Sequence, residues 1–161
     1  MMTGPGIVVS EARADDQRAQ AFAIRREVFV VEQGISEALE FDGLDAGTRH
    51  LLARRHGEPV GSLRLRFLEE GRVAKIERVA VRAAARRHKV GHALLQAALA
   101  LARAAGAREA RLHAQCTVQE FYARLGFAAC GPTFIEDGIL HVMMRRALPE
   151  PCGPLSGAQA R

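Results

Sequence analysis

Four consecutive side chains that could bind phosphate stand in one turn of the chain. Arg86, Arg87, His88 and Lys89 lie between an apolar strand segment and a helical segment that opens near Gly91. Backbone N–H groups at a helix N-terminus lack intrahelical partners, and the peptide dipoles add partial positive charge there. The residues alone leave three interpretations open: a solvated basic loop, a contact with nucleic acid, or a site for a small phosphorylated cofactor.

Length and composition limit the class of protein. The chain has 161 residues, of which 48% are hydrophobic and 25% charged, as in one ordinary globular domain. No apolar run approaches the roughly 20 residues that span a bilayer, and the N-terminus lacks the features of a signal peptide. We therefore expect a cytoplasmic protein with no membrane partner. Three cysteines without a CxxC pair predict neither a disulfide framework nor a metal site.

The balance of charge favours an anionic partner. The formal net charge is +5 and the sequence pI is near 9.8. Phosphorylated cofactors, nucleic acids and membrane headgroups would all be attracted by such a charge. With one Tyr and no Trp, the chain offers little aromatic surface for stacking on bases, so we expect no nucleic-acid partner.

Hydrophobic periodicity and turn residues predict a mixed α/β single domain over residues 1–148. The expected strands are 7–9, 50–55, 63–67, 73–82, 110–114, 127–134 and 139–147, and the expected helices are 15–33, 91–105 and 117–125. An antiparallel meander, a central parallel pair and a C-terminal hairpin then make a sheet of about seven strands flanked by helices. Ligands tend to bind where the strand order changes. We expect residues 149–161, rich in Pro, Gly and small residues, to be a disordered tail.

The segment from residue 32 to residue 45 is acidic. It contains Glu32, Glu37, Glu40, Asp42 and Asp45. One interpretation is a solvated face on a loop or a short helix. The other is a rim of carboxylates beside a cleft, which would raise the local concentration of an amine.

Two segments resemble the signatures of the GNAT superfamily of N-acyltransferases. The first is Glu77-Arg78-Val79-Ala80-Val81 followed by Arg86-x-x-Lys89-x-Gly91-x-Ala93-Leu94-Leu95, which is similar to the superfamily's acyl-CoA-binding motif. The second is Gln115-x-x-Val118-x-x-Phe121-Tyr122-x-x-x-Gly126-Phe127, where the superfamily usually has Asn first and Ala fourth. The two occur in the expected order and in matching elements. The resemblance covers residues 7–148 and implies the GNAT fold, which has the strand order predicted above.

Lys89 departs from the first signature, because the superfamily has Gly there. A side chain at this place crowds the approach of the backbone to phosphate, although its ammonium group can itself pair with phosphate. The Lys-Val-Gly order is similar to that of the bacterial ElaA-like subgroup. So are residues 27–33, 49–52 and 136–141, which read EVFVVEQ, RHLL and EDGILH. We interpret Lys89 as a mark of that subgroup.

The resemblance implies acetyl-CoA as the cosubstrate and no metal. In this superfamily the pantetheine amides pair with free strand backbone, which implies Val79, Ala80 and Val81 here. The residues implied to bind the pyrophosphate are Arg86, Arg87, His88, Lys89, Val90, Gly91 and His92. Gln115 would add a side-chain hydrogen bond to the cofactor.

The implied mechanism is direct attack of a neutral amine on the thioester, with the CoA thiolate as leaving group. Tyr122 is the expected acid for the sulfur, although an ordinary phenol has a pKa of about 10 and a thiol of about 8.5. Glu77 is the expected base, because strand alternation places it on the face of Val79 and Val81. An equally open alternative for Glu77 is a salt bridge with a neighbouring Arg. The alternatives are a relay of waters or the imidazole of His50, His113 or His141.

The acceptor is expected where the superfamily's acceptor-side loops fall. The residues expected there are Arg25, Phe29, Glu32, His50, Asp137 and His141. The leading prediction is an acetyl-CoA-dependent N-acetyltransferase acting on a primary amine of a small molecule or peptide. The alternative is a non-catalytic module of the same fold that binds CoA or nucleic acid. The last hairpin could pair with another subunit, which would make a homodimer.

Overall fold

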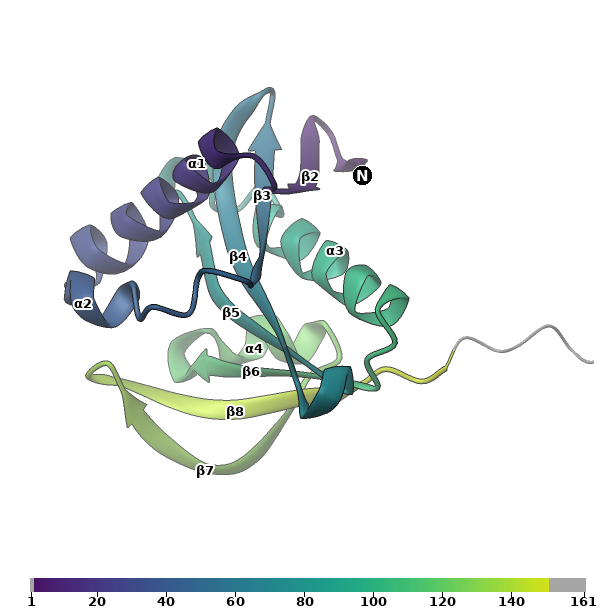
Figure 1. The fold of residues 1–161 in the computed structure, drawn as a ribbon. Helices are drawn as coiled ribbons and strands as arrows, with labels where there is room; N and C mark the ends of the chain where they lie inside the picture. Colours follow the sequence, from purple (N-terminus) through teal and green to yellow (C-terminus); the bar gives the residue numbers. More distant parts are fainter. Residues whose placement is uncertain (1, 151–161) are drawn as a thin grey trace, which may run out of the picture.

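The computed structural model describes residues 2–150, and its strands form one mixed eight-stranded sheet (Figure 1). The strands are β1 (Met2–Gly4), β2 (Ile7–Glu11), β3 (Arg49–Arg55), β4 (Glu58–Leu68), β5 (Val73–Val81), β6 (Glu109–Gln115), β7 (Ala128–Glu136) and β8 (Ile139–Ala147). Their order is β1-β2-β3-β4-β5-β6-β8-β7, and only β5 and β6 pair in parallel among these strands. Of the expected tail, residues 151–161 lie outside the described residues.

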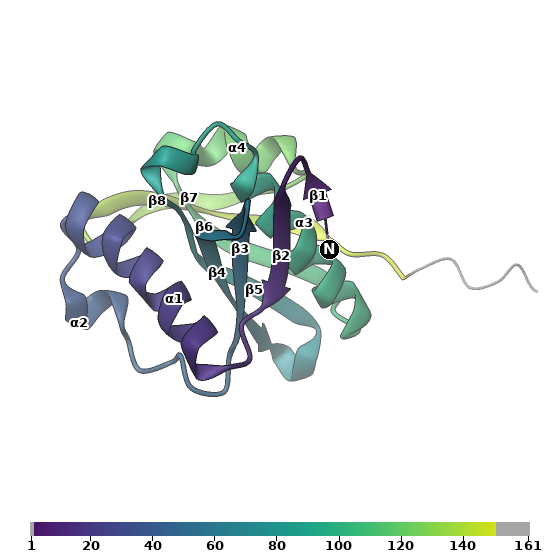
Figure 2. The same cartoon turned by 90° about the horizontal axis from the view of Figure 1, so that it is seen from above.

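Helices cover both faces of the sheet. They are α1 (Asp15–Arg25), the π-helix η1 (Arg26–Glu32), α2 (Glu37–Glu40), α3 (Val90–Ala104) and α4 (Gln119–Arg124), with the 3-10 turns η2 (Glu69–Gly71), η3 (Ala83–Ala85) and η4 (Cys116–Val118). Figures 1 and 2 show α1 and α2 on one face and α3 and α4 on the other. Among the described residues, no helix has the length and apolar composition needed to cross a membrane.

The predicted fold is confirmed, with two additions. The meander, the parallel pair and the hairpin all occupy their expected places. The added strand β1 pairs with β2 at the edge of the sheet, and three residues are too few to show a periodicity. The first helix continues as a π-helix, an element that often occurs at functional sites. Gly34 then takes a φ of 72° and ends it, as predicted.

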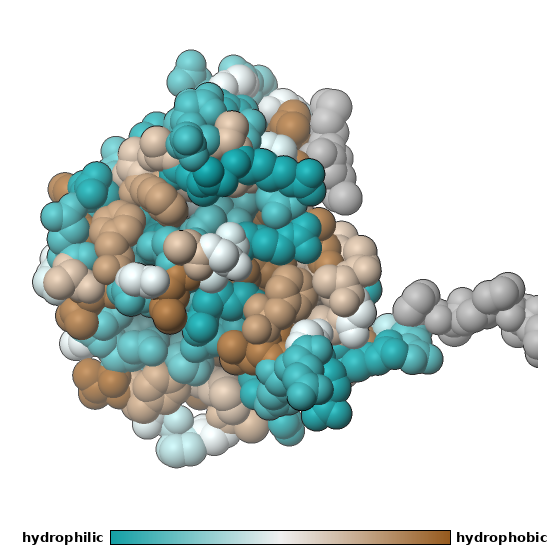
Figure 3. Space-filling model, viewed as in Figure 1, coloured by the Kyte–Doolittle hydropathy of each residue, from teal (hydrophilic) through white to brown (hydrophobic). Residues whose placement is uncertain are grey.

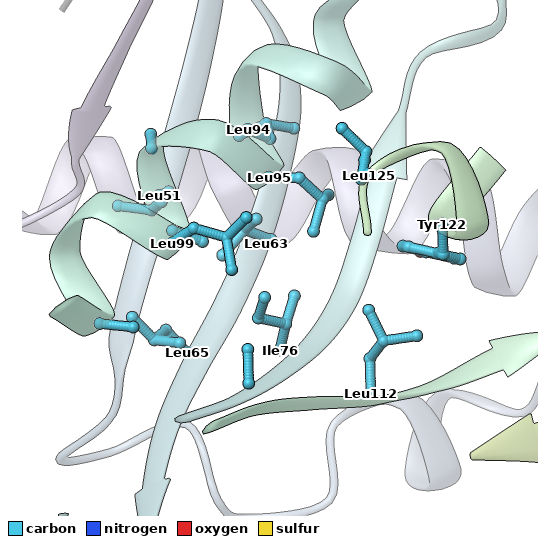
Figure 4. Packing of buried hydrophobic residues seen from close by; sticks show 14 of the residues in the cluster. Leu51, Leu63, Leu65, Ile76, Leu94, Leu95, Leu99, Leu112, Tyr122 and Leu125 are labelled. Carbon is cyan, nitrogen blue, oxygen red and sulfur yellow. The ribbon is translucent and has the colours of Figure 1, made fainter. Parts of the chain in front are cut away.

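The main hydrophobic core lies between α3 and the sheet (Figure 4). Apolar residues of α3 recur at three- and four-residue spacing, and Leu94, Leu95 and Leu99 are fully buried against strand residues such as Leu63 and Ile76. A smaller cluster on the opposite face packs α1 and η1 onto the sheet. The sheet is therefore buried on both sides at its centre.

A β-bulge in β5 shapes the centre of the sheet. Two residues of β5, Arg78 and Val79, oppose the single residue Leu63 of β4. Arg78 has a φ of 56°, in the left-handed region. On its other side, β5 pairs with β6 only as far as Ile76 and Leu112. Since a bulge bends and twists its strand, β5 and β6 separate beyond this pair.

The hairpin of β7 and β8 forms one edge of the sheet. Its outer strand β7 has no described strand on its far side. Ile135 and Leu140 are a cross-strand pair of this hairpin, and both are exposed. Figure 3 shows apolar and polar residues interspersed on the viewed face of the molecule. The homodimer expected through this hairpin stays a prediction.

We expect Gly61→Val to destabilise the fold. An added Cβ would lie 2.8 Å from Val90 Cγ1 and 3.0 Å from Leu94 Cδ1, so α3 would have to move away from β4. Overpacking of this kind costs about 1–3 kcal/mol of unfolding free energy, which urea unfolding would measure. Ser62→Ala is the matched control, because it removes a buried hydroxyl that has no hydrogen-bond partner. Equal stability of G61V and wild type would contradict this account of α3 packing.

Candidate functional site

A cleft opens between β5 and β6 where their pairing ends. It contains two adjoining cavities of about 430 and 680 Å³, sizes typical of small-molecule sites. The smaller, named here the η1 cavity, is lined by η1 and by the strands. The larger, named the α3 cavity, is lined by the basic turn, the start of α3 and α4. Both are lined by Val79, Val81, Arg86, Val118 and Tyr122, so they meet between the separated strands.

The basic turn presents backbone N–H groups to the α3 cavity. Arg87 and Lys89 have φ values of 72° and 63°, in the region where glycine is favoured. This conformation gives a physical reason why Gly would suit the position of Lys89. The first hydrogen bond of α3 runs from Ala93 N to Lys89 O, so the amides of residues 90–92 have no intrahelical partner.

Gly91 has a packing role in the first turn of α3. A Cβ at this position would lie 3.1 Å from Phe121 Cζ, so glycine lets α4 approach α3 closely. Of the seven residues predicted to bind pyrophosphate, six line the α3 cavity, whereas His88 lines neither cavity. The structure therefore brings most of the predicted phosphate site to one wall.

Two side chains predicted to bind the cofactor instead hold η1 to the cleft. Arg86 Nε donates to Val81 O at 3.0 Å, and Arg86 Nη2 donates to Glu32 at 2.7 Å. Gln115 exchanges two hydrogen bonds with Gln33, of 3.0 and 3.3 Å. In the sequence, nothing indicates that Gln33 reaches the cleft except its place in the EVFVVEQ segment. The charge of Glu32, a predicted acceptor-side residue, is thus compensated by Arg86.

Tyr122 lies where the two cavities meet. Its ring packs edge to face on Phe121 and Phe127, with centroid distances of 5.0 and 6.2 Å. Burial raises the pKa of the Tyr122 phenol. The hydroxyl therefore keeps its proton at neutral pH and can donate a hydrogen bond into the cleft.

Glu77 does not share a strand face with Val79 and Val81, so the expectation that it does is wrong. The extra residue of the bulge reverses the alternation along β5. Ile76 and Val79 consequently both pack with the core beneath α3. Glu77 faces the other side of the sheet, where it lines the η1 cavity.

Three cations surround the Glu77 carboxylate. Arg64 lies 2.7 Å from Oε2, and Arg66 and Lys75 lie 2.7 and 3.2 Å from Oε1. Burial alone would raise the pKa of Glu77, but the hydrogen bond from Arg66 and the charges of Arg64 and Lys75 lower it to about 2. A carboxylate with so low a pKa is a weak general base.

The carboxylates of residues 40–45 are paired with arginines, so the interpretation as a rim of free carboxylates is wrong there, and Glu40 is buried although residues 42–44 are exposed. Arg25 and Arg64, 0% and 1% exposed, lie beneath them. Arg25 contacts Glu40 at 2.8 Å and Asp45 at 2.6 Å, and Arg64 contacts Asp42 at 2.9 Å. Buried guanidinium groups need such partners, because an unpaired buried charge is strongly destabilising. The segment is thus anchored over the sheet by charge compensation.

Two of the predicted acceptor-side residues do not reach the cleft. Arg25 is enclosed by the ion pairs just described. His50 is buried, packs edge to face on Phe22 at 5.2 Å, and bonds to Asp45 O at 3.1 Å. The sequence does not show that the acidic segment covers these two side chains. The other four predicted residues line the η1 cavity, namely Phe29, Glu32, Asp137 and His141.

Glu136, at the end of β7, is a cleft residue that the sequence did not single out. Its Oε1 lies 3.2 Å from His113 Nδ1, and its Oε2 lies 3.8 Å from His141 Nε2. The EDGILH segment contains Glu136 and is its only sequence signal. No local pattern could reveal the contact, because β6 and β7 are separated by β8 in the sheet.

The chain is similar to acetyltransferases in sequence and in structure. Residues 12–148 match the family model described as "Acetyltransferase (GNAT) domain". The uncharacterized N-acetyltransferase YjcF of Bacillus subtilis is 32% identical over 84% of this chain and 96% of its own length.

Two solved structures extend the likeness. An acyl-CoA N-acyltransferase from Pseudomonas aeruginosa is 36% identical, with a TM-score of 0.74, and the match covers 88% of this chain and 99% of that one. Escherichia coli ElaA is 28% identical, also with a TM-score of 0.74, and the match covers 87% of this chain and 99% of that one. These findings confirm the family resemblance read from the sequence, including the likeness to ElaA.

We expect Glu77→Gln to lower stability at neutral pH and the deficit to shrink in acid. The folded-state pKa of about 2 lies below the ordinary 4.5, so the ionised carboxylate stabilises the fold above about pH 4.5 and this contribution is lost as the pH falls toward 2. The expected deficit at about pH 7 is on the order of 3 kcal/mol. Urea unfolding at about pH 7 and about pH 3 would measure it, with exposed Glu58→Gln as the control. A deficit independent of pH would contradict the assignment.

Proposed function

Because the chain belongs to the GNAT acetyltransferase family, we propose that it transfers an acetyl group from acetyl-CoA to a primary amine of a small molecule or peptide. The observation that carries this proposal is the cleft between β5 and β6. It joins an anion site at the start of α3 to a cavity that contains Tyr122 and titratable side chains. A cofactor bound along it would extend from the phosphate site to the η1 cavity.

The α3 cavity is the proposed site of the CoA pyrophosphate. The free amides of residues 90–92 and the dipole of α3 favour an anion. Arg87 and Lys89 line the same cavity, and their cationic side chains can form charge-assisted hydrogen bonds with phosphate oxygens. Lys89 adopts the left-handed conformation that a glycine would have at this position, so the turn has the same backbone shape.

The free edge of β5 is the proposed site of pantetheine. Beyond Ile76, β5 has no partner strand on the side of β6. The backbone of residues 79–81 can therefore pair with the pantetheine amides as a strand edge pairs with a peptide. The Val81 carbonyl is held by Arg86 Nε in this structure, so pantetheine would compete with Arg86 for it. Gln115 is the proposed side-chain contact.

Tyr122 is the proposed hydrogen-bond donor to the leaving sulfur. The amine nitrogen bonds to the thioester carbonyl carbon, the C–S bond breaks, and its electron pair stays on sulfur. A buried phenol that keeps its proton can stabilise that developing charge by a hydrogen bond. The place of Tyr122 where the two cavities meet supports this role.

Arg87→Gln together with Lys89→Gln should weaken CoA binding about 100-fold or more, because each lost charge-assisted contact is worth about 1.5 kcal/mol or more. The kcat should change little. Isothermal calorimetry with CoA would measure the affinity. Arg72→Gln with Arg103→Gln removes the same charge at the far ends of β5 and α3 and is the control. No heat with CoA, together with salt-dependent binding to duplex DNA, would favour a nucleic-acid-binding module instead.

Tyr122→Phe should lower kcat about 10-fold or more while CoA still binds, because only the hydroxyl is lost. Thiol release from acetyl-CoA with a panel of primary amines would measure turnover, and the panel would also identify acceptors. Calorimetry with CoA and a thermal melt would check that the variant is folded. Turnover equal to that of the wild type would assign Tyr122 to packing alone.

A further inference from the structure

The proposed reaction requires a group that accepts a proton from the attacking amine. Glu77 is unsuited, because its pKa of about 2 makes it a weak base. His50 is enclosed beneath the acidic segment and lines neither cavity. The remaining candidates are the imidazoles on the opposite wall of the η1 cavity.

His113 is directed toward the η1 cavity by its place in β6. It follows Leu112, the last residue of β6 that pairs with β5. Leu112 packs in the core beneath α3, so the alternation of the strand turns His113 to the other face. There it lines the same cavity as Tyr122. The imidazole therefore stands just beyond the point where the strands separate.

Glu136 determines which nitrogen of His113 is free. An ionised carboxylate only accepts hydrogen bonds, so the 3.2 Å contact between Glu136 Oε1 and His113 Nδ1 places the proton on Nδ1. The neutral ring then carries its lone pair on Nε2. No residue in the described part of the chain bonds to Nε2. A carboxylate that orients an imidazole in this way leaves the second nitrogen available as a base.

The surroundings keep Glu136 ionised and the imidazoles in place. The hydrogen bond from His113 lowers the pKa of Glu136 and outweighs its burial, and the charge of Lys75 acts in the same direction. Phe134 packs edge to face on His113 at 5.0 Å and stacks on His141 at 6.0 Å. His141 Nδ1 donates to Ile139 O at 2.7 Å, which fixes the second ring.

We propose that His113, oriented by Glu136, takes the proton of the acceptor amine, a step that rests on the proposed acetyl transfer. The alkylammonium acceptor first gives one proton to His113 Nε2, and the imidazolium releases this proton to solvent. The neutral amine nitrogen then bonds to the thioester carbon, the C–S bond breaks with its electron pair on sulfur, and the second N–H proton passes to the thiolate. The products are the amide and the CoA thiol, and His113 is neutral again. Glu136 is a positioning residue in this scheme.

The same corner of the cleft suits an acceptor that is an ammonium ion at neutral pH. Glu136 and Asp137 line the η1 cavity and have no Arg or Lys partner among the described residues. The other carboxylates that line this cavity each pair with an Arg or a Lys. A primary alkylamine arrives protonated and must lose a proton before it attacks, which gives His113 its role. We therefore assign small primary alkylamines as the acceptor class.

Charged groups from several elements surround His113. The charged and titratable groups that line the cavity with His113 include Lys75, Glu77, Tyr122, Glu32, Asp137 and His141. Among these, the Glu77 carboxylate contacts Lys75 at 3.2 Å, in addition to its contacts with Arg64 and Arg66.

The tautomer of His113 tests the arrangement without any turnover. Long-range ¹H–¹⁵N correlation on the full chain labelled with ¹⁵N-histidine reports the protonated nitrogen of each of its six imidazoles, and His113→Gln assigns the signal. We expect Nδ1–H in the wild type and a mixture of tautomers in Glu136→Ala. An Nε2–H tautomer in the wild type would overturn the proposal whether or not the protein acetylates amines.

Kinetics with two probe amines test the proton transfer itself. General bases contribute about 10²–10⁴-fold, so His113→Gln should lower kcat with 1,4-diaminobutane about 100-fold or more and leave the KM for acetyl-CoA unchanged. The loss with methoxyamine, which is neutral at neutral pH, should be much smaller. Glu136→Ala should show the same pattern with a smaller loss. His56→Asn, in an exposed turn that lines neither cavity, is the control.

Each outcome of the kinetic test decides a different point. Equal losses with both amines would indicate a structural role and would overturn the assignment of His113. Loss of CoA binding by H113Q would also indicate a structural role for His113 and overturn the assignment, because the variant would then have a damaged cleft. A wild-type protein that binds CoA but acetylates neither probe would count against the proposed function, whatever the tautomer of His113.

Discussion

The cleft depends on the β-bulge at Arg78. A non-glycine residue with positive φ is uncommon, and the strain persists only where neighbouring groups hold it. Here the Arg78 guanidinium contacts Glu40 at 3.0 Å and Asp42 at 3.3 Å, both from the acidic segment. That segment is itself anchored by Arg25 and Arg64. A network of buried and half-buried charges thus holds the bulge that separates β5 from β6.

The bulge also distributes charge within the cleft. Glu77, just before the bulge, lies on the opposite face from Val79 and Val81 and among three cations, where the carboxylate stays ionised and its basicity is low. The carboxylate of Glu136 lies across the cavity between two imidazoles instead. Two acidic side chains in one cavity therefore differ in their chemistry because of their partners. On the other side of the sheet, the start of α3 is the proposed anion site.

The parts of the fold that were predicted from the sequence rest on local patterns. Alternation in β4 is visible in the sequence and holds in the structure, with Leu63 and Leu65 on the core side and Arg64 and Arg66 on the other. The same rule failed in β5, because a single extra residue reverses the faces that follow it and leaves no mark in composition. The π-helix was missed for a similar reason. Its hydrogen bonds span one residue more than those of an α-helix, and the apolar spacing of its residues does not show this difference.

The sequence by itself determined the order of elements, the basic turn before α3 and the family, because each depends on residues within a few positions of one another or on motifs in a fixed order. Only the tertiary structure decided which polar and charged side chains already have partners. Arg86 is paired with Glu32, and Gln115 is paired with Gln33, 82 residues away in the chain. Likewise, His113 gains Glu136 only because β8 pairs with both β6 and β7 in the sheet. Such pairings depend on distances in the folded chain, which no spacing along the sequence records.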